Sequence, residues 1–422
     1  MNIMDASVYI AELVRQARGA AGVLATTNGA RRDAAIRACA AALRANKTGL
    51  KAANQKDLDR APQFGLTAAM TDRLRLTDKT LDAMADALEQ IAAQTDPVGQ
   101  TLSAYNRPDG LRIEKRRVPI GVIGFIYESR PNVTTDAAGL FLKSGNACIL
   151  RGGKEALHSN LAVAACVRQA VADAGLPAAA VTMIDNPDRD IVAAMAKAEG
   201  GIDLIIPRGG EKLIRAVTDV ATVPVIKHYT GNCHVYVHAD ADPATARAIV
   251  RNAKCQRPGV CNAAETLLVH ASHVQSGLLG QLLDDLAGAG VELRGDERTR
   301  ALRGDVKPAD ESDWATEYLD LILAVRVVDD LEQAVEHVNA YGSRHTDAIM
   351  TQSLAAAERF TAAVDSASVM VNASTRLADG GVYGLGAEVG ISTDKLHARG
   401  PMGAEDLTTY KWIVTGQGHL RT

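Results

Sequence analysis

Aromatic side chains are scarce in this sequence, making up 4% of its 422 residues. The core must therefore consist mainly of Ala, Val, Leu and Ile. Long hydrophobic runs are lacking too, since no stretch of about 18 apolar residues predicts a membrane span. Residues 1–7 lack the basic start and the apolar core of a signal peptide. We therefore expect a cytoplasmic protein with no membrane partner.

The sequence also lacks a strong net charge and paired cysteines. Its net charge of -4 gives no broad basic field, which argues against nucleic acid as a partner. The six cysteines contain no CxxC pair and no metal-ligand spacing, so the spacing predicts no metal site and favours a reducing compartment over a disulfide framework. Hydrophobic residues (47%) and charged residues (23%) are present at ordinary globular levels, and the length predicts at least two domains.

The first part of the chain shows helical periodicity and then changes character. Residues 5 to about 95 carry apolar side chains at helical spacing, which predicts a helical scaffold. From Thr101 to Val118 apolar and polar residues alternate around the turn Pro108-Asp109-Gly110. This pattern predicts a β-hairpin, and a projecting hairpin is a natural subunit contact.

Short buried strands then alternate with helices, which is the pattern of a doubly wound parallel α/β sheet. We expect strands at 119–126, 147–150, 181–184 and 204–206. Ligands bind beyond the carboxyl ends of such strands, where glycine-rich turns with basic residues lie at 151–154 and 207–212. Their backbone N–H groups suit the phosphates of a nucleotide, although plain tight turns are the simpler alternative. A strand, a turn and a second strand over 223–237 then lead into another α/β set.

One cysteine in this second set stands out. Residues 257–265 (RPGVCNAAE) form a small-residue turn that delivers Cys261 just before the apolar, β-prone run 266–269. A cysteine at the end of a rigid element can be exposed as a nucleophile. The alternative is a buried structural thiol, because cysteine is often fully buried.

Four blocks of the sequence resemble the γ-glutamyl phosphate reductase family, a branch of the aldehyde dehydrogenase superfamily. They are residues 119–150, 251–269, 335–350 and 384–411. The resemblance implies an aldehyde dehydrogenase-like α/β fold with a Rossmann-type cofactor domain, an α/β catalytic domain and small β oligomerisation elements near 101–118 and 407–416. We expect an NADP-binding domain over 1–235, a catalytic domain over 236–375, and a return segment with an oligomerisation strand over 376–422.

The resemblance also implies an activity. It is the NADPH-dependent reduction of L-glutamyl 5-phosphate to L-glutamate 5-semialdehyde and phosphate through a thioester on Cys261, the second step of proline biosynthesis from glutamate. It further implies a homo-oligomer, dimer or tetramer, and leaves open a contact with glutamate 5-kinase. A hydrolytic aldehyde dehydrogenase is one alternative, but it needs a general base, and residues 227–232 contain no carboxylate. A non-catalytic member of the fold is the other alternative.

The matched positions assign roles to individual residues, each of which has an ordinary surface or structural role as its alternative. The catalytic and oxyanion-binding residues implied are Cys261, Asn262, Ser129 and Asn132. The NADP-binding residues implied are Arg151, Gly152, Gly153, Lys154, Arg208, Gly209, Gly210 and Glu317. The substrate-binding residues implied are Arg130, Lys395, His397 and Arg399.

Overall fold

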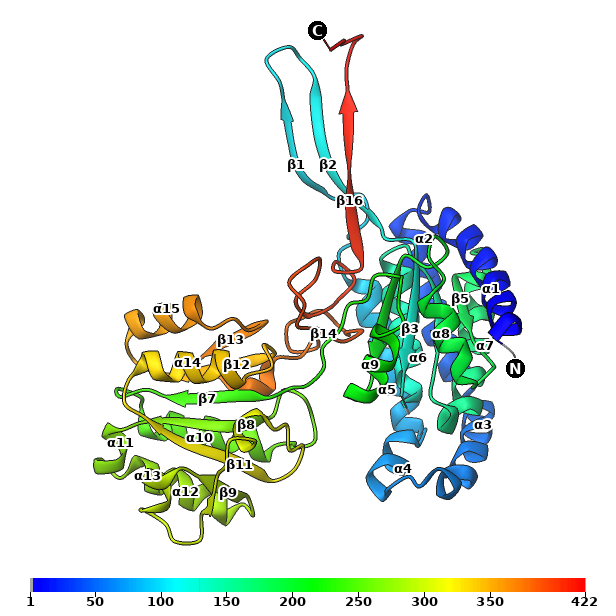
Figure 1. Cartoon of the computed structure of the whole chain (residues 1–422). Coiled ribbons are helices and arrows are strands. Elements are labelled where there is room, and N and C mark those ends of the chain that lie inside the picture. Colours follow the sequence, from blue (N-terminus) through cyan, green and yellow to red (C-terminus); the bar gives the residue numbers. More distant parts are fainter. Residues whose placement is uncertain (1–2, 129, 422) are drawn as a thin grey trace. The chain divides into compact units, whose positions relative to one another are not determined.

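The computed structural model describes residues 3–128 and 130–421, and the chain divides into two compact units (Figure 1). Unit 1 consists of Met1–Lys227, Gly384–Gly390 and Met402–Thr422. Unit 2 consists of His228–Tyr383 and Ile391–Pro401. The chain thus leaves unit 1 after residue 227, builds unit 2, and returns to unit 1 twice.

Unit 1 contains a four-stranded parallel sheet in the order β5-β4-β3-β6. Its strands are β3 (Val122–Tyr127), β4 (Ala147–Arg151), β5 (Val181–Met183) and β6 (Leu204–Arg208). They are short and almost wholly buried, as expected for parallel strands covered on both faces. The helices are α1 (Ile3–Leu24), α2 (Gly29–Ala45), α3 (Lys47–Arg60), α4 (Ala68–Leu74), α5 (Asp78–Ala93), α6 (Pro131–Lys143), α7 (Leu157–Asp173), α8 (Arg189–Ala196) and α9 (Glu211–Thr218).

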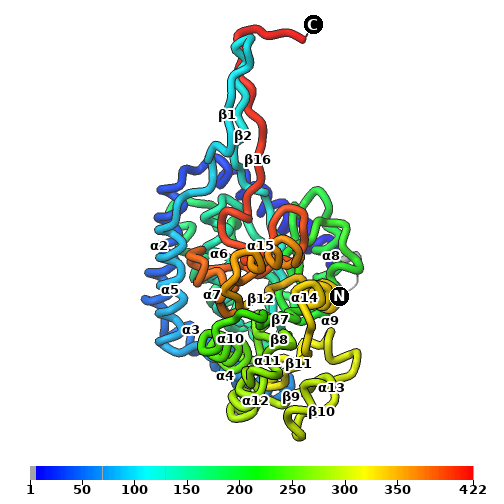
Figure 2. Tube along the Cα trace, turned by 90° about the vertical axis from the view of Figure 1, so that its left-hand side faces the viewer, coloured from blue at the N-terminus to red at the C-terminus, as the bar shows by residue number. Residues whose placement is uncertain are grey.

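A separate three-stranded antiparallel sheet extends from unit 1, as both views show (Figures 1 and 2). It joins β1 (Thr101–Asn106), β2 (Arg112–Pro119) and β16 (Thr408–Thr415) in that order. The hairpin β1-β2 turns at Gly110, whose φ of 88° is easy only for glycine. β16 pairs with β2 over eight residues, from Thr408 opposite Pro119 to Thr415 opposite Arg112. The predicted hairpin and C-terminal strand are therefore confirmed.

Unit 2 is built on a seven-stranded parallel sheet in the order β10-β9-β11-β8-β7-β12-β13. The strands are β7 (Cys233–Val237), β8 (Ala264–His270), β9 (Glu292–Gly295), β10 (Lys307–Pro308), β11 (Ile322–Val328), β12 (Thr346–Met350) and β13 (Ser368–Val371). The helices are α10 (Pro243–Cys255), α11 (Ser272–Gln275), α12 (Leu278–Gly288), α13 (Glu297–Arg300), α14 (Leu331–Tyr341) and α15 (Leu354–Ala363). The short strands β14 (Ile391–Ser392) and β15 (Gly400–Pro401) form a separate pair.

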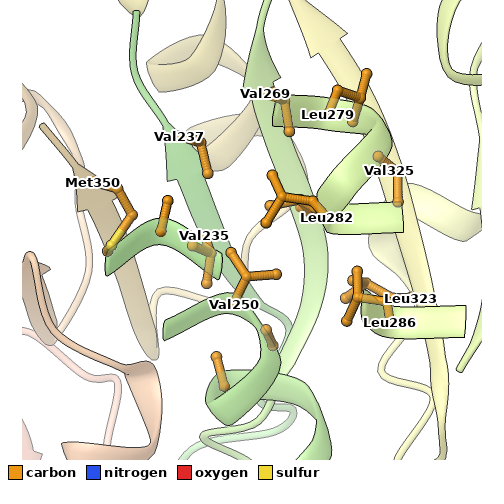
Figure 3. Close-up of a cluster of buried hydrophobic side chains, with 14 of the residues drawn as sticks. Val235, Val237, Val250, Val269, Leu279, Leu282, Leu286, Leu323, Val325 and Met350 are labelled. Atoms are coloured by element: carbon orange, nitrogen blue, oxygen red, sulfur yellow. The ribbon is translucent and has the colours of Figure 1, made fainter. Parts of the chain in front are cut away.

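Alternate side chains of the central strands β7, β8, β11 and β12 enter two different cores. On one face Val235 and Val269 pack with Leu282 of α12 and Val250 of α10 (Figure 3). On the other face Tyr236 packs with α14 and α15. Both faces of the sheet are thus covered by helices, which confirms the predicted α/β class with parallel sheets.

One local prediction was wrong. Residues 223–226 do not form a strand but make only an isolated bridge between Ile205 and Val225, because Pro224 supplies no N–H for a ladder. Residues 272–288 form two helices, α11 and α12, which are separated by Gly277 with its φ of 80°. Among the described residues, no helix is long and apolar enough to cross a membrane.

Candidate active site

Cys261 lies in the turn between the end of α10 at Cys255 and the start of β8 at Ala264. The turn is closed by a hydrogen bond from the Ala263 N–H to the Val260 carbonyl (3.0 Å). Cys261 is half-buried, so its sulfur is neither sealed in the core nor fully hydrated. The turn precedes a strand, which places this cysteine at the amino edge of the parallel sheet of unit 2.

The backbone of Gly231 is pressed against the backbone of Cys261. A Cβ atom built on Gly231 would lie 1.9 Å from the Cys261 carbonyl oxygen and 2.4 Å from its Cα, closer than real Cβ contacts come. The Gly231 N–H donates to Oε1 of Glu317 (2.9 Å). Only a residue without a side chain fits here, so position 231 fixes how the two loops meet. Glu317, predicted to bind the nicotinamide ribose, contacts this loop.

Two histidines stand beside the Cys261 sulfur. One ring nitrogen of His228, one of His345 and the Cys261 Sγ all lie within 4.8 Å of one another. The two rings meet edge to face with centroids 5.6 Å apart. His345 is fully buried, and burial together with the nearby His228 lowers its pKa to about 3. Its ring is therefore neutral at physiological pH.

A second cysteine, Cys233, contacts the backbone of the turn that carries Cys261. The thiol of Cys233, at the start of β7, donates to the Cys261 carbonyl (3.2 Å) and lies 3.8 Å from Nδ1 of His345. Burial, with the charge of Asp347, raises the pKa of Cys233 well above its ordinary value. Cys233 is therefore an inert thiol that holds the nucleophile loop, while Cys261 is the half-buried one.

A buried ion pair ties the turn before β8 to the segment that carries Glu317. Nζ of Lys254 lies 2.6 Å from Oε2 of Glu265, and neither side chain is exposed. The other oxygen, Oε1, accepts the Leu319 N–H (3.1 Å). Lys254 is the last but one residue of α10, and Glu265 lies in β8, so this pair fixes both ends of the Cys261 turn.

Asn262 is buried, and its side-chain amide forms structural hydrogen bonds. Its Nδ2 donates to the carbonyl of Ala378 (2.9 Å) and makes a longer contact with that of Arg376 (3.5 Å). These contacts hold the segment after β13 against the nucleophile turn. The prediction that this amide stabilises the oxyanion remains untested, and in this geometry the Cys261 N–H is the simpler donor.

Two arginines that the sequence analysis passed over lie close to the cysteines. Burial and the neighbouring Arg257 lower the pKa of Arg376, whereas Asp379, Cys261 and Cys233 oppose that shift. A cation in this position stabilises the thiolate form of Cys261. Arg257 sits in the recognised motif itself, but Arg376 lies over a hundred residues away and no local pattern marked it.

The predicted substrate cations of unit 2 gather at one carboxylate. Nζ of Lys395 and Nη2 of Arg399 lie 2.7 Å and 2.8 Å from the two oxygens of Asp365. These hydrogen bonds lower the pKa of Asp365. His397, between the two cations in sequence, is exposed and has a φ of 70°. The structure thus brings Lys395 and Arg399 together at Asp365. An anionic substrate that binds these two cations would have to compete with the Asp365 carboxylate.

In unit 1, the predicted cofactor residues follow β4 and β6 at their carboxyl ends. Arg151 ends β4, and its Nη2 donates to the Pro187 carbonyl (2.9 Å), while its Nε has no hydrogen-bond partner in the described chain. Burial lowers the pKa of Arg151, the nearby carboxylate of Glu155 opposes that shift, and the positive charge of Arg189 adds to it. Arg189, at the start of α8, is thus a second cation that the sequence analysis missed. Lys154 is exposed and lies over the Phe64 ring (5.3 Å).

The glycines of the two turns are held closely by neighbours. A Cβ on Gly152 would lie 2.1 Å from Nδ2 of Asn160, and one on Gly153 would meet the carboxylate of Glu155 at 2.0 Å. Position 152 therefore requires glycine, whereas the Glu155 side chain can move away from position 153.

The second turn already holds a carboxylate. Gly210 precedes α9, and its N–H donates to Oε2 of Glu128 (3.1 Å), while a Cβ on Gly209 would lie 2.6 Å from the Glu128 carboxyl carbon. Arg208 donates to the Glu388 carbonyl (2.9 Å) and lies 3.8 Å from its carboxylate. A phosphate at this helix N-terminus would have to displace Glu128, so the first turn is the better candidate for a cofactor phosphate.

The loop before α6 was predicted to supply an oxyanion donor and a substrate cation. Ser129 lies outside the described residues. Arg130 immediately precedes the helix, and the Asn132 amide donates to Oδ2 of Asp136 (3.1 Å), one helical turn further on. Burial raises the pKa of Asp136 to about 6, with Arg208 and the Asn132 bond opposing the shift. In this structure the Asn132 amide is therefore bound within its own helix.

These features define a fold class, and the sequence of the chain agrees with it. Residues 5–299 match the aldehyde dehydrogenase family model. The chain belongs to the aldehyde dehydrogenase family, whose members use NAD or NADP, and the fold predicted from the sequence is confirmed.

The particular branch is given by relatives that the chain matches over nearly its full length. A γ-glutamyl phosphate reductase from Rhodopirellula baltica is 51% identical over 417 residues, covering 99% of this chain and 96% of the relative. The crystal structure of γ-glutamyl phosphate reductase from Thermotoga maritima is 45% identical, covers 97% of this chain and 99% of its own, and superposes with a TM-score of 0.95. The Saccharomyces cerevisiae γ-glutamyl phosphate reductase is 30% identical over 97% of this chain and 98% of its own, with a TM-score of 0.54. The predicted family is thereby confirmed.

Proposed function

We propose that this chain reduces L-glutamyl 5-phosphate to L-glutamate 5-semialdehyde and phosphate with NADPH, the second step of proline biosynthesis from glutamate. The relatives named for this reaction support the proposal. The observation that carries it is the loop packed on Cys261. Gly231 fills the position beside the nucleophile with backbone alone, and residues 227–232 contain no carboxylate to activate water. Because the loop 227–232 supplies no general base, we expect a thioester here to resist hydrolysis and to be available to phosphate in the reverse direction.

The first chemical step is attack of the Cys261 thiolate on the acyl phosphate carbon. Burial of the ring keeps His345 neutral, and the positive charge of Arg376 favours the thiolate. The Cys261 N–H donates to the oxygen as negative charge develops. The C–O bond to phosphate then breaks, inorganic phosphate leaves, and a thioester remains on the sulfur.

When bound, NADPH supplies the hydride that reduces the acyl group to an aldehyde. Arg151, Arg189 and Lys154 fit the cofactor for two reasons. The buried Nε of Arg151 has no hydrogen-bond partner in the described chain, and a bound anion would reduce the repulsion between the Arg151 and Arg189 guanidinium groups. The 2′-phosphate of NADPH is such an anion, and NADH has no 2′-phosphate. Gly152 lets the backbone lie flat on Asn160. We also propose that Glu317 binds the nicotinamide ribose.

The substrate brings a carboxylate and a phosphate, and the cations at Asp365 are proposed to receive them. Lys395 and Arg399 then exchange one anionic partner for another, so that binding costs little desolvation. Arg130 and His397 stay proposed substrate ligands, as do Ser129 and Asn132 for the oxyanion and Arg208, Gly209 and Gly210 for the cofactor. Contact with glutamate 5-kinase stays a prediction from the family resemblance.

The three-stranded sheet of unit 1 is proposed to join copies of the chain into a dimer or tetramer. Its exposed side chains include Tyr105 (53%), Tyr410 (49%), Trp412 (53%) and Val414 (57%), an apolar surface that a monomer would leave in water. We also propose a cytoplasmic location, since the cysteines form no disulfide in the described part of the chain and a half-buried thiol nucleophile needs a reducing compartment. Light scattering on Trp412→Glu should show smaller particles than the parent protein.

The reverse reaction tests the activity. Glutamate 5-semialdehyde and NADP are supplied with and without inorganic phosphate, and NADPH formation is followed by absorbance. Strict dependence on phosphate is expected. NADPH formation without phosphate, with glutamate as the product, would show that water resolves the thioester and that the enzyme is a hydrolytic dehydrogenase.

Two cysteine variants complete this experiment. Cys261→Ser should abolish turnover in both directions while NADP binding is kept, and Cys255→Ser, six residues upstream, should leave turnover unchanged. Activity retained in Cys261→Ser would place the nucleophile elsewhere.

A further inference from the structure

The sulfur of Cys261 and the rings of His228 and His345 form a cluster that the proposed reaction uses only in part. One donor atom from each side chain lies within 4.8 Å of the other two. His228 lies 33 residues before Cys261 in the sequence and His345 lies 84 residues after it, so no local spacing predicts the cluster. The described residues contain no second group of three such side chains.

His345 supplies the observation that points to a ligand. Its ring is fully buried, and its Nε2 has no hydrogen-bond partner among the residues that the structure describes. Its Nδ1 lies 2.9 Å from the hydroxyl of Thr346. A buried polar atom without a partner costs free energy, and most such atoms in proteins have one. An imidazole whose Nδ1 is held by a neighbour and whose Nε2 carries a lone pair is also the usual form of a metal-binding histidine.

From this geometry we propose that His228, Cys261 and His345 together bind a thiophilic divalent metal ion such as Zn²⁺. Two imidazole nitrogens and one thiolate are a ligand set that zinc accepts, with a fourth position left for water. Around tetrahedral zinc, ligand atoms lie about 3.3 to 3.6 Å apart. The cluster must therefore contract by about 1 Å, which His228 and Cys261 can provide because both are half-buried and lie in turns.

The charges around the cluster determine how tightly we expect it to bind zinc. Arg376 lies near the cysteine with Arg257 beside it, and these two charges oppose a further positive charge. Binding also releases the thiol proton to solvent as the sulfur–metal bond forms. The site should consequently bind zinc reversibly and release it to a chelator, unlike a structural zinc site with four protein ligands.

Occupation of the site would block the proposed chemistry, and this consequence rests on the proposed function. A sulfur bonded to zinc cannot attack an acyl phosphate, so zinc should inhibit turnover and a chelator should restore it. Binding itself does not depend on the reaction. It is measured by competition with a chromophoric chelator and by the rate at which iodoacetamide alkylates Cys261, followed by peptide mass spectrometry.

The test titrates zinc chloride into the full-length protein and into matched variants. One zinc ion per chain and protection of Cys261 from alkylation are expected. Cys261→Ser and His228→Gln should each weaken zinc binding by at least about tenfold, since each removes one of three ligands. Cys255→Ser and His270→Gln are the controls, because both residues lie in unit 2 outside the cluster and should leave binding unchanged.

His345→Gln should weaken binding to the same degree, and His228→Gln makes the same test at a half-buried position if the buried substitution prevents folding. Cobalt adds a spectroscopic measurement, in which a thiolate-to-cobalt absorption band should be present in the parent protein and absent from Cys261→Ser. Equal zinc affinity in the parent, Cys261→Ser and His228→Gln would overturn the proposal. Zinc binding with Cys261 protection but no turnover under any condition would keep the metal site and reject the proposed function.

Discussion

The contact between Gly231 and Cys261 leads to a sharp prediction for Gly231→Ala. The added Cβ would lie 1.9 Å from the Cys261 carbonyl oxygen, and real Cβ contacts essentially never fall below 3.0 Å. The two loops must therefore separate by at least about 1.1 Å. Gly231 does not have a positive φ, so alanine suits its backbone and the effect is purely one of space.

The expected loss follows from that displacement. Moving a nucleophile by about 1 Å from its reacting position can cost about 10²-fold in rate. The same separation strains the bond from the Gly231 N–H to Glu317 and the one from the Cys233 thiol to the Cys261 carbonyl. Overpacking of this kind also costs about 1–3 kcal/mol of unfolding free energy. Steady-state turnover and urea denaturation of Gly231→Ala should show both losses.

A matched glycine separates this effect from alanine substitution in general. Gly280 lies inside α12, where an added Cβ would meet nothing within 4 Å. Gly280→Ala should leave turnover unchanged and stabilise the protein by about 0.5–1 kcal/mol, because alanine favours the helix. Unchanged turnover in Gly231→Ala would refute the reasoning and would mean that the Cys261 loop adapts without loss of its catalytic position.

Other substitutions test the cofactor turn, the buried ion pair and the core. Arg151→Ala should weaken NADPH binding much more than NADH binding, with Arg37→Ala in α2 as a neutral control; equal losses for both cofactors would remove the 2′-phosphate role. Lys254→Met should cost about 3–5 kcal/mol because it leaves the buried Glu265 carboxyl group without its cation, and Lys254→Met/Glu265→Gln should be more stable than that single variant in urea. Leu282→Ala should cost about 2–5 kcal/mol, and a smaller loss would mean that the α12 core refills the cavity (Figure 3).

The elements of the fold could be predicted because their signals are local. A buried strand is a short apolar run, and a helix shows its period within about four turns. The turn that delivers Cys261 could be recognised for the same reason, since all of its residues are adjacent. Val223–Ile226 was misjudged because its composition is strand-like, and only Pro224 and the lack of a neighbouring ladder prevent a strand there.

The partners of Cys261 could not be predicted because they depend on strand order. β7 lies between β8 and β12 in the sheet, so the turns that precede these three strands meet at one edge. That adjacency brings His228, Cys233 and His345 to the cysteine from 33, 28 and 84 residues away. Sequence periodicity predicts the strands but not their order in the sheet. Without that order, the residues that lie next to a histidine before a strand cannot be predicted.

The pairing of β16 with β2 has a consequence for how the protein is made. Arg117 and Thr408 are 291 residues apart and hydrogen-bonded. On the ribosome, β2 is therefore synthesised long before β16, and throughout that time one side of the hairpin offers unpaired backbone groups to any other nascent strand. Unit 2, formed mostly from the uninterrupted stretch His228–Tyr383, can fold meanwhile. Cells that make this protein would need to shield the waiting hairpin until the last strand arrives.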